Sequence, residues 1–176
     1  MTRSRAVFMD RDGTLMEDVG YPRDPAQVRL LPGVTEALRR LHDAGFLLVI
    51  VSNQSGVGRG LISPEQATAV HRRLMEMLGE DGVSLDQARY CPHAPEDGCD
   101  CRKPSPSMLI DAAFSLDIDL SVSYMIGDKR SDVEAGRRAG CRTILLESGG
   151  GETAGADHLV SDLSGALAVI LPGVPA

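Results

Sequence analysis

Two aspartates separated by one residue follow a short apolar segment near the start of the chain. Residues 7–14 read Val-Phe-Met-Asp-Arg-Asp-Gly-Thr, which places the carboxylates at Asp10 and Asp12. Two acids this close repel each other when buried, unless a cation or a proton compensates their charge. With a divalent metal bound, one aspartate could attack as a nucleophile while the other transfers a proton. The simpler alternative is an Asp-Gly turn after a strand.

Two further polar residues follow apolar segments of their own. Ser52 comes directly after the apolar run 46–51, and Asp128 comes shortly after the run 122–126. If these runs are parallel strands, their carboxyl ends share one edge of the sheet, so these side chains would meet the two aspartates there. A third acid at this edge predicts a Mg²⁺ site, because Mg²⁺ prefers oxygen ligands beside a phosphate.

Lys103 offers a positive charge for the same phosphate, and the Ser52 hydroxyl can donate a hydrogen bond to it. Each residue also has a structural alternative. Ser52 could simply end a strand, Lys103 could be a surface residue, and Asp128 could cap a helix that begins at Arg130. We favour the catalytic interpretation because all of these residues occur in the right order at strand ends.

Strand-like and helix-like segments alternate along the chain, which predicts a doubly wound parallel sheet in a single α/β domain, residues 1–176. Strands are expected over residues 5–9, 46–51, 122–126, 142–146 and 158–160. Helices are expected over residues 32–44, after a capping box at Ser63-Pro64-Glu65-Gln66, over 106–116, from Arg130 to a stop at Gly140, and up to about residue 171. The glycines at 149–151 are expected to form a flexible loop, since they lack the ending of a phosphate-binding loop.

Composition excludes several classes of function. The net charge is −7 and aromatic residues make up only 3%, which argues against a nucleic-acid-binding module or a polynucleotide phosphatase. We find neither a membrane-spanning run nor the apolar core of a signal peptide, so a cytoplasmic protein without membrane contacts is expected. Because no long heptad pattern demands a partner, we expect a monomer.

Three of the four cysteines lie within eleven residues, together with a histidine. Cys91, His93, Cys99 and Cys101 form a C-x-H-x5-C-x-C pattern, which is typical of tetrahedral Zn²⁺. Four protein ligands leave no open position, so this zinc would be structural. It would fix the loop at about 91–101 and thereby orient the adjacent Arg102 and Lys103. Cys141 is expected to lie in the core.

These motifs resemble the haloacid dehalogenase superfamily of phosphatases, with Asp10 to Thr14, Ser52, Lys103 and Gly127-Asp128 as its four motifs in order. The resemblance implies that Asp10 attacks phosphorus to form an aspartyl-phosphate, while Asp12 protonates the leaving group and then activates water. It further implies Mg²⁺ held by Asp10, Asp128 and the carbonyl of Asp12. Asp132 is expected to support the metal or cap a helix. No cap domain fits between the motifs, so the site should be open.

Two capless families with a zinc loop are similar: heptose-1,7-bisphosphate 7-phosphatases and histidinol-phosphate phosphatases. The segment 52–60 and residues 18–21 resemble the heptose enzymes of nucleotide-heptose and lipopolysaccharide biosynthesis, whereas the short spacing from His93 to Cys99 resembles the histidinol enzymes. The heptose resemblance implies a phosphorylated-sugar substrate, whose second phosphate would meet Arg59, Arg102 or Lys129. The implied substrate contacts are Asp18, Val19, Gly20, Tyr21, Ser52, Asn53, Gln54, Ser55, Arg59, Arg102, Lys103 and Lys129.

Overall fold

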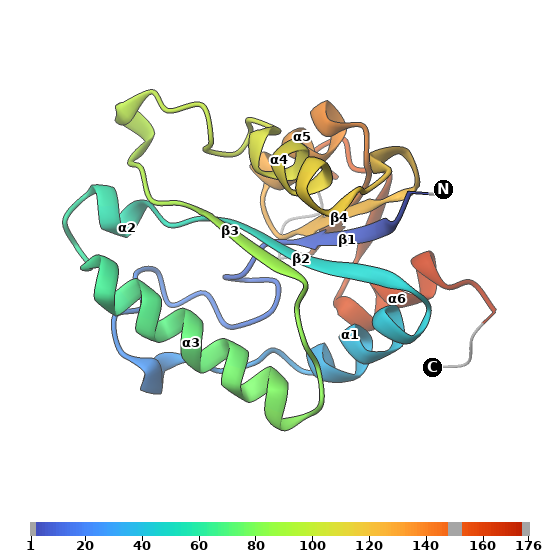
Figure 1. Ribbon diagram of the computed structural model, residues 1–176, viewed down its shortest axis with the longest axis horizontal. Helices are drawn as coiled ribbons and strands as arrows, with labels where there is room; N and C mark the ends of the chain where they lie inside the picture. The colour runs from blue at the N-terminus through green and yellow to red at the C-terminus, as the bar shows by residue number, and fades with distance from the viewer. Residues whose placement is uncertain (1–2, 148–152, 174–176) are drawn as a thin grey trace.

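The computed structural model describes residues 3–147 and 153–173, so the predicted glycine loop at 149–151 lies outside the described residues. Six parallel strands form one sheet in the order β3-β2-β1-β4-β5-β6 (Figure 1). The strands are β1 (Arg5–Met9), β2 (Phe46–Asn53), β3 (Gln87–Cys91), β4 (Tyr124–Gly127), β5 (Arg142–Leu146) and β6 (His158–Val160). The helices are α1 (Val34–Asp43), α2 (Ser55–Gly58), α3 (Pro64–Glu80), α4 (Ser107–Leu116), α5 (Arg130–Ala139) and α6 (Leu163–Ile170).

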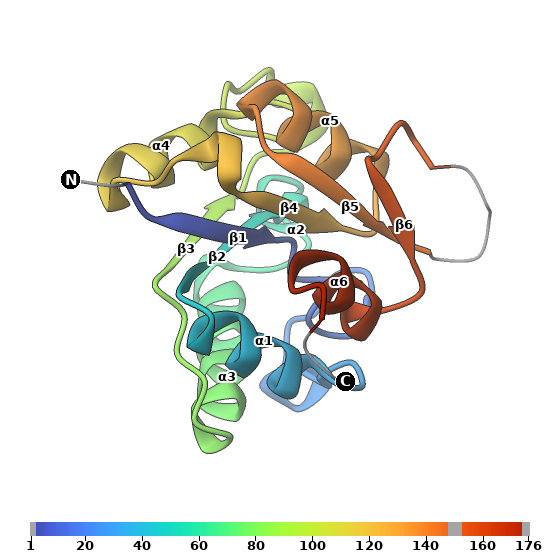
Figure 2. The same cartoon turned by 90° about the vertical axis from the view of Figure 1, so that its right-hand side faces the viewer.

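Helices cover both faces of the sheet. In Figure 2, α4 and α5 lie on one side of the strands, and α1, α3 and α6 lie on the other. The strands alternate accordingly: Val7 and Met9 of β1 pack into the core beneath α1, α3 and α6, whereas Ala6 and Phe8 pack into the core beneath α4 and α5. Because both faces are buried, the central strands are almost wholly apolar, which confirms the predicted doubly wound sheet.

Local signals in the sequence set several helix ends. At the start of α3, the Ser63 hydroxyl accepts the N–H of Gln66, and the Gln66 side chain accepts the N–H of Ser63. This confirms the predicted capping box. Helix α5 ends at Gly140, which adopts the left-handed conformation that favours glycine.

Two elements were not anticipated, and one strand begins later than predicted. The segment at β3 has a polar, half-buried sequence without an apolar run, as befits a strand at the sheet edge. Helix α2 contains only one turn, too short to give a periodic pattern. The strand predicted from residue 122 begins at Tyr124, because Leu120–Val122 forms a 3₁₀ turn. Within the described residues, no helix is both long and apolar enough to cross a bilayer.

The strands that carry the motifs are neighbours. Because β2, β1 and β4 are adjacent and parallel, Asn53, Asp10 and Asp128 occur one after another along the carboxyl edge of the sheet. Strand β3 extends this edge and ends at Cys91. The chemistry-bearing residues are therefore brought together by strand order, as the sequence predicted.

Candidate active site

A cavity of about 340 Å³ opens at the carboxyl edge of the sheet. Its walls come from the ends of β1 and β2, from the segment at residues 18–21, from the loop before α4 and from the start of α5. The lining residues are Asp10, Asp12, Asp18, Gly20, Tyr21, Asn53, Gln54, Ser55, Gly56, Arg102, Lys103, Lys129, Ser131 and Asp132. Most of the residues predicted from sequence to contact a substrate therefore surround one space.

Three carboxylates converge beside this cavity, of which Asp10 and Asp132 line it. Oxygens of Asp10, Asp128 and Asp132 all lie within 4.8 Å of one another. Burial, together with the neighbouring carboxylates of Asp10 and Asp132, raises the pKa of Asp128 to about 6. The buried Oδ1 atom of Asp128 has no hydrogen-bond partner among the residues that the structure describes. A hard cation with oxygen ligands fits this arrangement, because it would relieve the repulsion and partner the buried oxygen.

Two glycines allow these carboxylates to approach. A Cβ atom on Gly13, whose φ is +80°, would collide with the carboxylate of Asp128. A Cβ atom on Gly127 would likewise collide with the side chain of Asp132. The acid cluster therefore depends on glycines whose role is steric, and both occur inside the sequence motifs.

Lys103 is buried between two of the acids. Its ammonium lies 2.6 Å from Asp132 Oδ1 and 3.1 Å from Asp10 Oδ1, and it donates a hydrogen bond of 2.7 Å to the carbonyl of Val51. Burial disfavours the charged amine, but the two carboxylates outweigh it and raise the pKa of Lys103. The lysine therefore stays protonated beside Asp10, where it can attract a phosphoryl group.

Asp132 has two structural roles. Besides its ion pair with Lys103, its Oδ2 atom accepts the N–H of Lys129 at 3.0 Å and so caps α5. The geometry agrees with the expected support and capping roles, and it also places Asp132 among the acids that could surround a cation. Its almost complete burial was not predicted, because nothing in the local sequence indicates a partner at Lys103.

Asn53 positions the backbone of Lys103. Its side-chain amide donates to the Lys103 carbonyl and accepts the Lys103 N–H, both at 3.0 Å. This reciprocal pair ties the end of β2 to the loop before α4. Asn53 lines the cavity, yet its amide is used to hold the lysine in place.

Asp12 is held by a buried network that the sequence analysis did not anticipate. Arg11 donates from Nε to Asp12 Oδ2 and from Nη2 to Asp12 Oδ1, each at 3.1 Å. Gln54 donates from Nε2 to Asp12 Oδ2 at 2.8 Å. Arg11 is only 1% exposed, which is unusual for an arginine and indicates a dedicated partner. The position of Arg11 between the two aspartates was the only feature of the sequence that pointed to this role.

An ion pair crosses the mouth of the cavity. Lys129 Nζ lies 2.9 Å from Asp18 Oδ2, although the two residues are 111 positions apart in the sequence. Partial burial opposes both charges, but the pairing prevails, lowering the pKa of Asp18 and raising that of Lys129. The segment at residues 18–21 and the start of α5 are thereby joined over the acid cluster.

Not every predicted contact lines this cavity. Ser52 is buried beneath Gln54, which donates to its hydroxyl at 3.0 Å. Val19 and Arg59 are exposed and do not appear among the cavity residues. Ser131 does line the cavity, although the sequence offered no reason to choose it.

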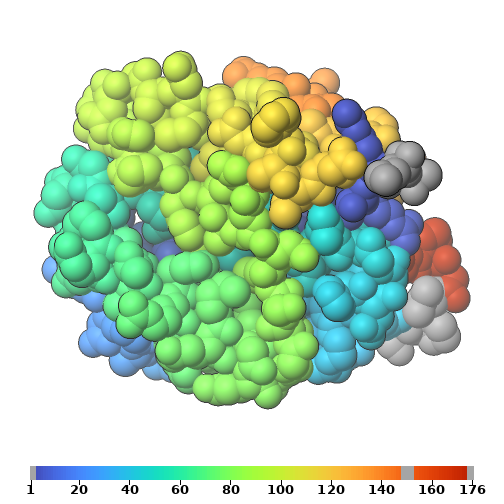
Figure 3. Space-filling model, viewed as in Figure 1, coloured from blue at the N-terminus to red at the C-terminus, as the bar shows by residue number. Residues whose placement is uncertain are grey.

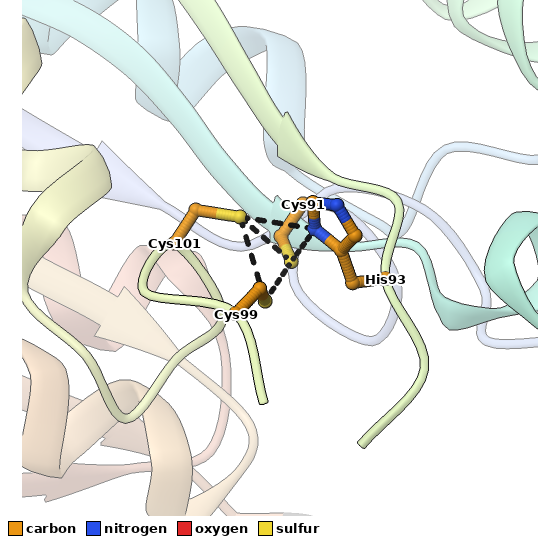
Figure 4. A group of neighbouring side chains, drawn as sticks. All are labelled: Cys91, His93, Cys99 and Cys101. Carbon is orange, nitrogen blue, oxygen red and sulfur yellow. Dashed lines mark hydrogen bonds between the residues drawn. The ribbon is translucent and has the colours of Figure 1, made fainter. Parts of the chain in front are cut away.

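The predicted cysteine cluster assembles at the end of β3. Cys91, His93, Cys99 and Cys101 direct their side chains toward a common point (Figure 4). The Cys91 sulfur lies 3.1 Å from that of Cys101 and 3.5 Å from that of Cys99, and the Cys99 and Cys101 sulfurs are 3.6 Å apart. His93 Nδ1 lies 3.3 Å from the Cys101 sulfur.

These separations approach those of a tetrahedral metal site. With metal–sulfur bonds of about 2.3 Å, the sulfurs of a tetrahedral site lie about 3.8 Å apart. Burial raises the pKa of the Cys91 thiol to about 12, so a bound metal would have to displace its proton. Four soft ligands at such distances fit a closed site with no position for substrate. Cys141 lies apart, buried beneath α4 and α5 as expected.

The cluster is connected to the cavity through the backbone. The Cys91 carbonyl accepts the N–H of Gln54 at 2.7 Å, and the Pro92 carbonyl accepts the N–H of Gly58 at 2.7 Å. On the other side, the Arg102 guanidinium donates to the His93 carbonyl at 3.3 Å. The cluster therefore fixes chain segments on two sides of the cavity.

Comparison with known proteins gives consistent matches. The HAD-hydrolase-like family model matches residues 100–169. D-glycero-D-manno-heptose-1,7-bisphosphate 7-phosphatase of Thermosynechococcus vestitus is 43% identical over 84% of this chain and 81% of its own length. D-glycero-beta-D-manno-heptose-1,7-bisphosphate 7-phosphatase of Haemophilus ducreyi is 41% identical over 97% of this chain and 98% of its own length.

A solved structure matches the fold closely. The D,D-heptose 1,7-bisphosphate phosphatase of B. bronchiseptica, complexed with magnesium and phosphate, superposes with a TM-score of 0.86 at 33% sequence identity. The match covers 94% of this chain and 97% of that one. A putative HAD-like phosphatase from Mesorhizobium loti gives a TM-score of 0.85 at 36% identity, covering 96% of this chain and 86% of that one.

Proposed function

The chain belongs to the heptose-1,7-bisphosphate 7-phosphatase family of haloacid dehalogenase-like hydrolases, and from this premise we propose that it removes the 7-phosphate of D-glycero-D-manno-heptose 1,7-bisphosphate. The relative from Haemophilus ducreyi is named for the β anomer, so the β anomer is the substrate we propose. The product would feed nucleotide-heptose biosynthesis.

One observation carries this proposal. Asp10, Asp12 and Lys103 line the same cavity beside a cluster of three acids, and this cavity lies at the carboxyl edge of a parallel sheet. A nucleophile, a proton-transfer group and a phosphate-binding cation are thus available within one space. A polynucleotide phosphatase is disfavoured by the same features as before, namely the net charge of −7 and the scarcity of aromatic residues.

The residues support a reaction in two steps. A carboxylate oxygen of Asp10 forms a bond to phosphorus as the bond between phosphorus and the sugar oxygen breaks, and Asp12 gives its proton to that leaving oxygen. Water then attacks the phosphorus of the aspartyl-phosphate, and Asp12 takes the proton that the water loses. The bond to Asp10 breaks and inorganic phosphate leaves. Throughout, Lys103 attracts the phosphoryl oxygens.

We propose Mg²⁺ as the cation of the acid cluster, held by Asp10, Asp128 and the backbone carbonyl of Asp12. When bound, Mg²⁺ offsets the negative charge of the carboxylates and phosphate. The all-oxygen donor set and the unpartnered Asp128 oxygen support this choice. Asp132 faces the same point but is engaged by Lys103, so we assign it a supporting role.

We propose structural Zn²⁺ for the cysteine cluster. Three sulfurs and one imidazole nitrogen converge at nearly tetrahedral spacing, and this donor set favours zinc over magnesium. The metal would stabilise the loop whose backbone contacts Gln54, Gly58 and Arg102. No step of the reaction passes through it.

Specificity would come from the cavity walls. Asp18, Gly20, Tyr21, Asn53 and Ser55 line the cavity and are proposed to contact the sugar. Arg102 and Lys129 also line it, and as cations they suit the second phosphate. Arg59 is proposed only as an outer contact, since it does not line the cavity, and Val19 has the same status.

Three further properties belong to this proposal. One domain is expected to carry the whole activity, because the proposed catalytic groups converge at one edge of one sheet. A cytoplasmic location suits both a sugar bisphosphate and four unpaired cysteines. A monomer is expected, because no long heptad pattern in the sequence demands a partner.

Phosphorus NMR of the reaction tests the proposed function. Wild-type protein with Mg²⁺ should convert the bisphosphate into heptose 1-phosphate and inorganic phosphate, leaving the anomeric phosphate signal in place. The Asp10→Asn variant should be folded and inactive, because the neutral amide cannot form the acyl phosphate. Loss of the anomeric phosphate instead, or turnover by Asp10→Asn, would refute the proposal.

A further inference from the structure

Gln54 uses its side-chain amide for contacts within the protein. Its Nε2 atom donates to Asp12 Oδ2 at 2.8 Å and to Ser52 Oγ at 3.0 Å, while its Oε1 atom accepts from Arg11 Nη2 at 2.8 Å. The residue lines the cavity but is only 7% exposed. Its two amide hydrogens are therefore committed before a substrate enters.

The chemistry of the neighbours fixes the orientation of this amide. Arg11 can only donate hydrogen bonds, so it must face the amide oxygen of Gln54. The amide nitrogen, which can only donate, then faces Asp12 Oδ2 and Ser52 Oγ, and both of these oxygens can accept. The alternative amide orientation would set two donors together and two acceptors together. Gln54 thus has a single favourable arrangement, in which it bridges Arg11 and Asp12.

The backbone of Gln54 is equally constrained. Its N–H donates to the Cys91 carbonyl at 2.7 Å, which anchors it to the end of β3. Arg11 is in turn stabilised by a cation–π contact, in which its guanidinium lies 5.9 Å from the centre of the Tyr90 ring. Tyr90 is also on β3, and its hydroxyl contacts His71 Nδ1 at 2.5 Å.

Gln54 lines two spaces, and Arg11 lines the second of them. The first is the cavity with Asp10 and Lys103, and the other is a second cavity of about 210 Å³. The second cavity is lined by Arg11, Gln54, Val57, Pro64, Ala67, Thr68, His71, Tyr90 and Pro92. Figure 3 shows a hollow on this face, between the teal α2 segment and the yellow-green chain that follows β3. The Asp12 carboxylate is held by its hydrogen bonds to Arg11 and Gln54.

We propose that Gln54 is a positioning residue for Asp12, acting through its bond to the Asp12 carboxylate together with Arg11, and that its side chain does not bind substrate. This inference rests on the proposed phosphatase function and deepens it. Gln54 and Arg11 fix the carboxyl group at the place where it meets the leaving oxygen. Without Gln54, Asp12 loses one of its anchors and samples orientations from which proton transfer is slow.

This role has a specific kinetic signature. A poor leaving group such as an alkoxide needs the proton from Asp12, whereas a nitrophenolate leaves readily without one. Misplacing Asp12 should therefore lower kcat/KM more for alkyl esters than for nitrophenyl esters. This ratio is the suitable measure because it reports the first irreversible step. Binding of inorganic phosphate should not change, because Gln54 leaves the Asp10 and Lys103 contacts intact.

The test compares kcat/KM for an alkyl phosphate and for 4-nitrophenyl phosphate, together with the inhibition constant of inorganic phosphate. In Gln54→Met, kcat/KM should fall by about 10-fold to 100-fold for the alkyl ester and by less than about 3-fold for the nitrophenyl ester. The larger loss is part of the rate enhancement that general acid catalysis supplies. Gln54→Glu keeps the acceptor for Arg11 but removes the donor to Asp12, and should show the same pattern. Asp12→Asn should show it in a stronger form.

Gln87→Met is the matched control. Gln87 also accepts a hydrogen bond from an arginine, at 3.2 Å from Arg89 Nε, but it lies at the amino end of β3 away from the cavity. The kcat/KM of Gln87→Met should fall little for either ester. Equal losses on both esters by the Gln54 variants would overturn the inference in favour of general destabilisation, and a raised inhibition constant for phosphate would overturn it in favour of a substrate contact. The heptose bisphosphate serves as a second alkyl ester in the same comparison, and if the wild type hydrolyses none of the three esters, it is the proposed function that fails.

Discussion

Lys103 and Asp132 form a buried ion pair, with 2.6 Å between the ammonium nitrogen and Oδ1, although one lies in the loop before α4 and the other in the first turn of α5. The same lysine reaches Asp10 at 3.1 Å. This arrangement joins the proposed phosphate-binding cation and the proposed nucleophile to the helix that follows Asp128. Catalytic geometry and local stability therefore depend on the same contacts.

Replacing Lys103 should destabilise the protein as well as inactivate it. Lys103→Met leaves the buried carboxylates of Asp10 and Asp132 without their cation, which should cost about 3–5 kcal/mol in the free energy of unfolding. The double variant Lys103→Met/Asp132→Asn removes one of those charges while keeping a helix cap, so it should recover part of the loss. Urea unfolding in the absence of added metal measures both values. A Lys103→Met variant as stable as the wild type would contradict a buried ionised pair.

Gly13→Ala should weaken metal binding selectively. The added methyl group would collide with the Asp128 carboxylate and displace it from the acid cluster. The Mg²⁺ concentration needed for half-maximal activity should rise by about 10-fold to 100-fold, as for other changes that disturb a ligand's support. Gly45→Ala is the control, since Gly45 has a similar φ of +84° but open space around its Cβ position. If both variants need the same Mg²⁺ as the wild type, the steric account of Gly13 is wrong.

Removing one ligand of the cysteine cluster should loosen the loop without removing the acid cluster. Cys99→Ala should lose bound zinc, expose the loop at 91–101 to hydrogen exchange and lower kcat/KM, because Gln54 and Arg102 contact that loop. Metal analysis, hydrogen exchange and kinetics are measured on the same sample. Cys141→Ala serves as the control, because this buried thiol lies outside the cluster. A zinc-free Cys99→Ala with unchanged exchange and turnover would exclude the proposed role of zinc.

The sequence predicted the sheet and the location of the site well, for physical reasons. Strands β1 and β2 are apolar because both of their faces are covered, and the acids follow strands directly, so the shared edge could be inferred. The cysteine spacing was equally informative, because four soft ligands lie within one short loop. These features are local in sequence.

The missing parts depend on contacts between distant segments. Strand β3 was not predicted, because an edge strand needs no long apolar run. Gln54 bonds to Asp12, and Asp132 bonds to Lys103. Each bond joins two distant segments, and no spacing of residues in the sequence predicts that these segments meet. Nothing in the local sequence indicates that Arg11 is buried, although it is among the most buried side chains of the described residues. The sequence therefore indicated the proposed reacting groups but not the residues that hold them.

The proposed substrate is tested most directly by phosphate release with Mg²⁺ from the β and α anomers of D-glycero-D-manno-heptose 1,7-bisphosphate and from histidinol phosphate. The account predicts that kcat/KM for the β anomer exceeds that for histidinol phosphate by at least about 100-fold, because Arg102 and Lys129 would meet a second phosphate that histidinol phosphate lacks. A preference for histidinol phosphate would contradict the account and would make the short cysteine loop the determinant of specificity.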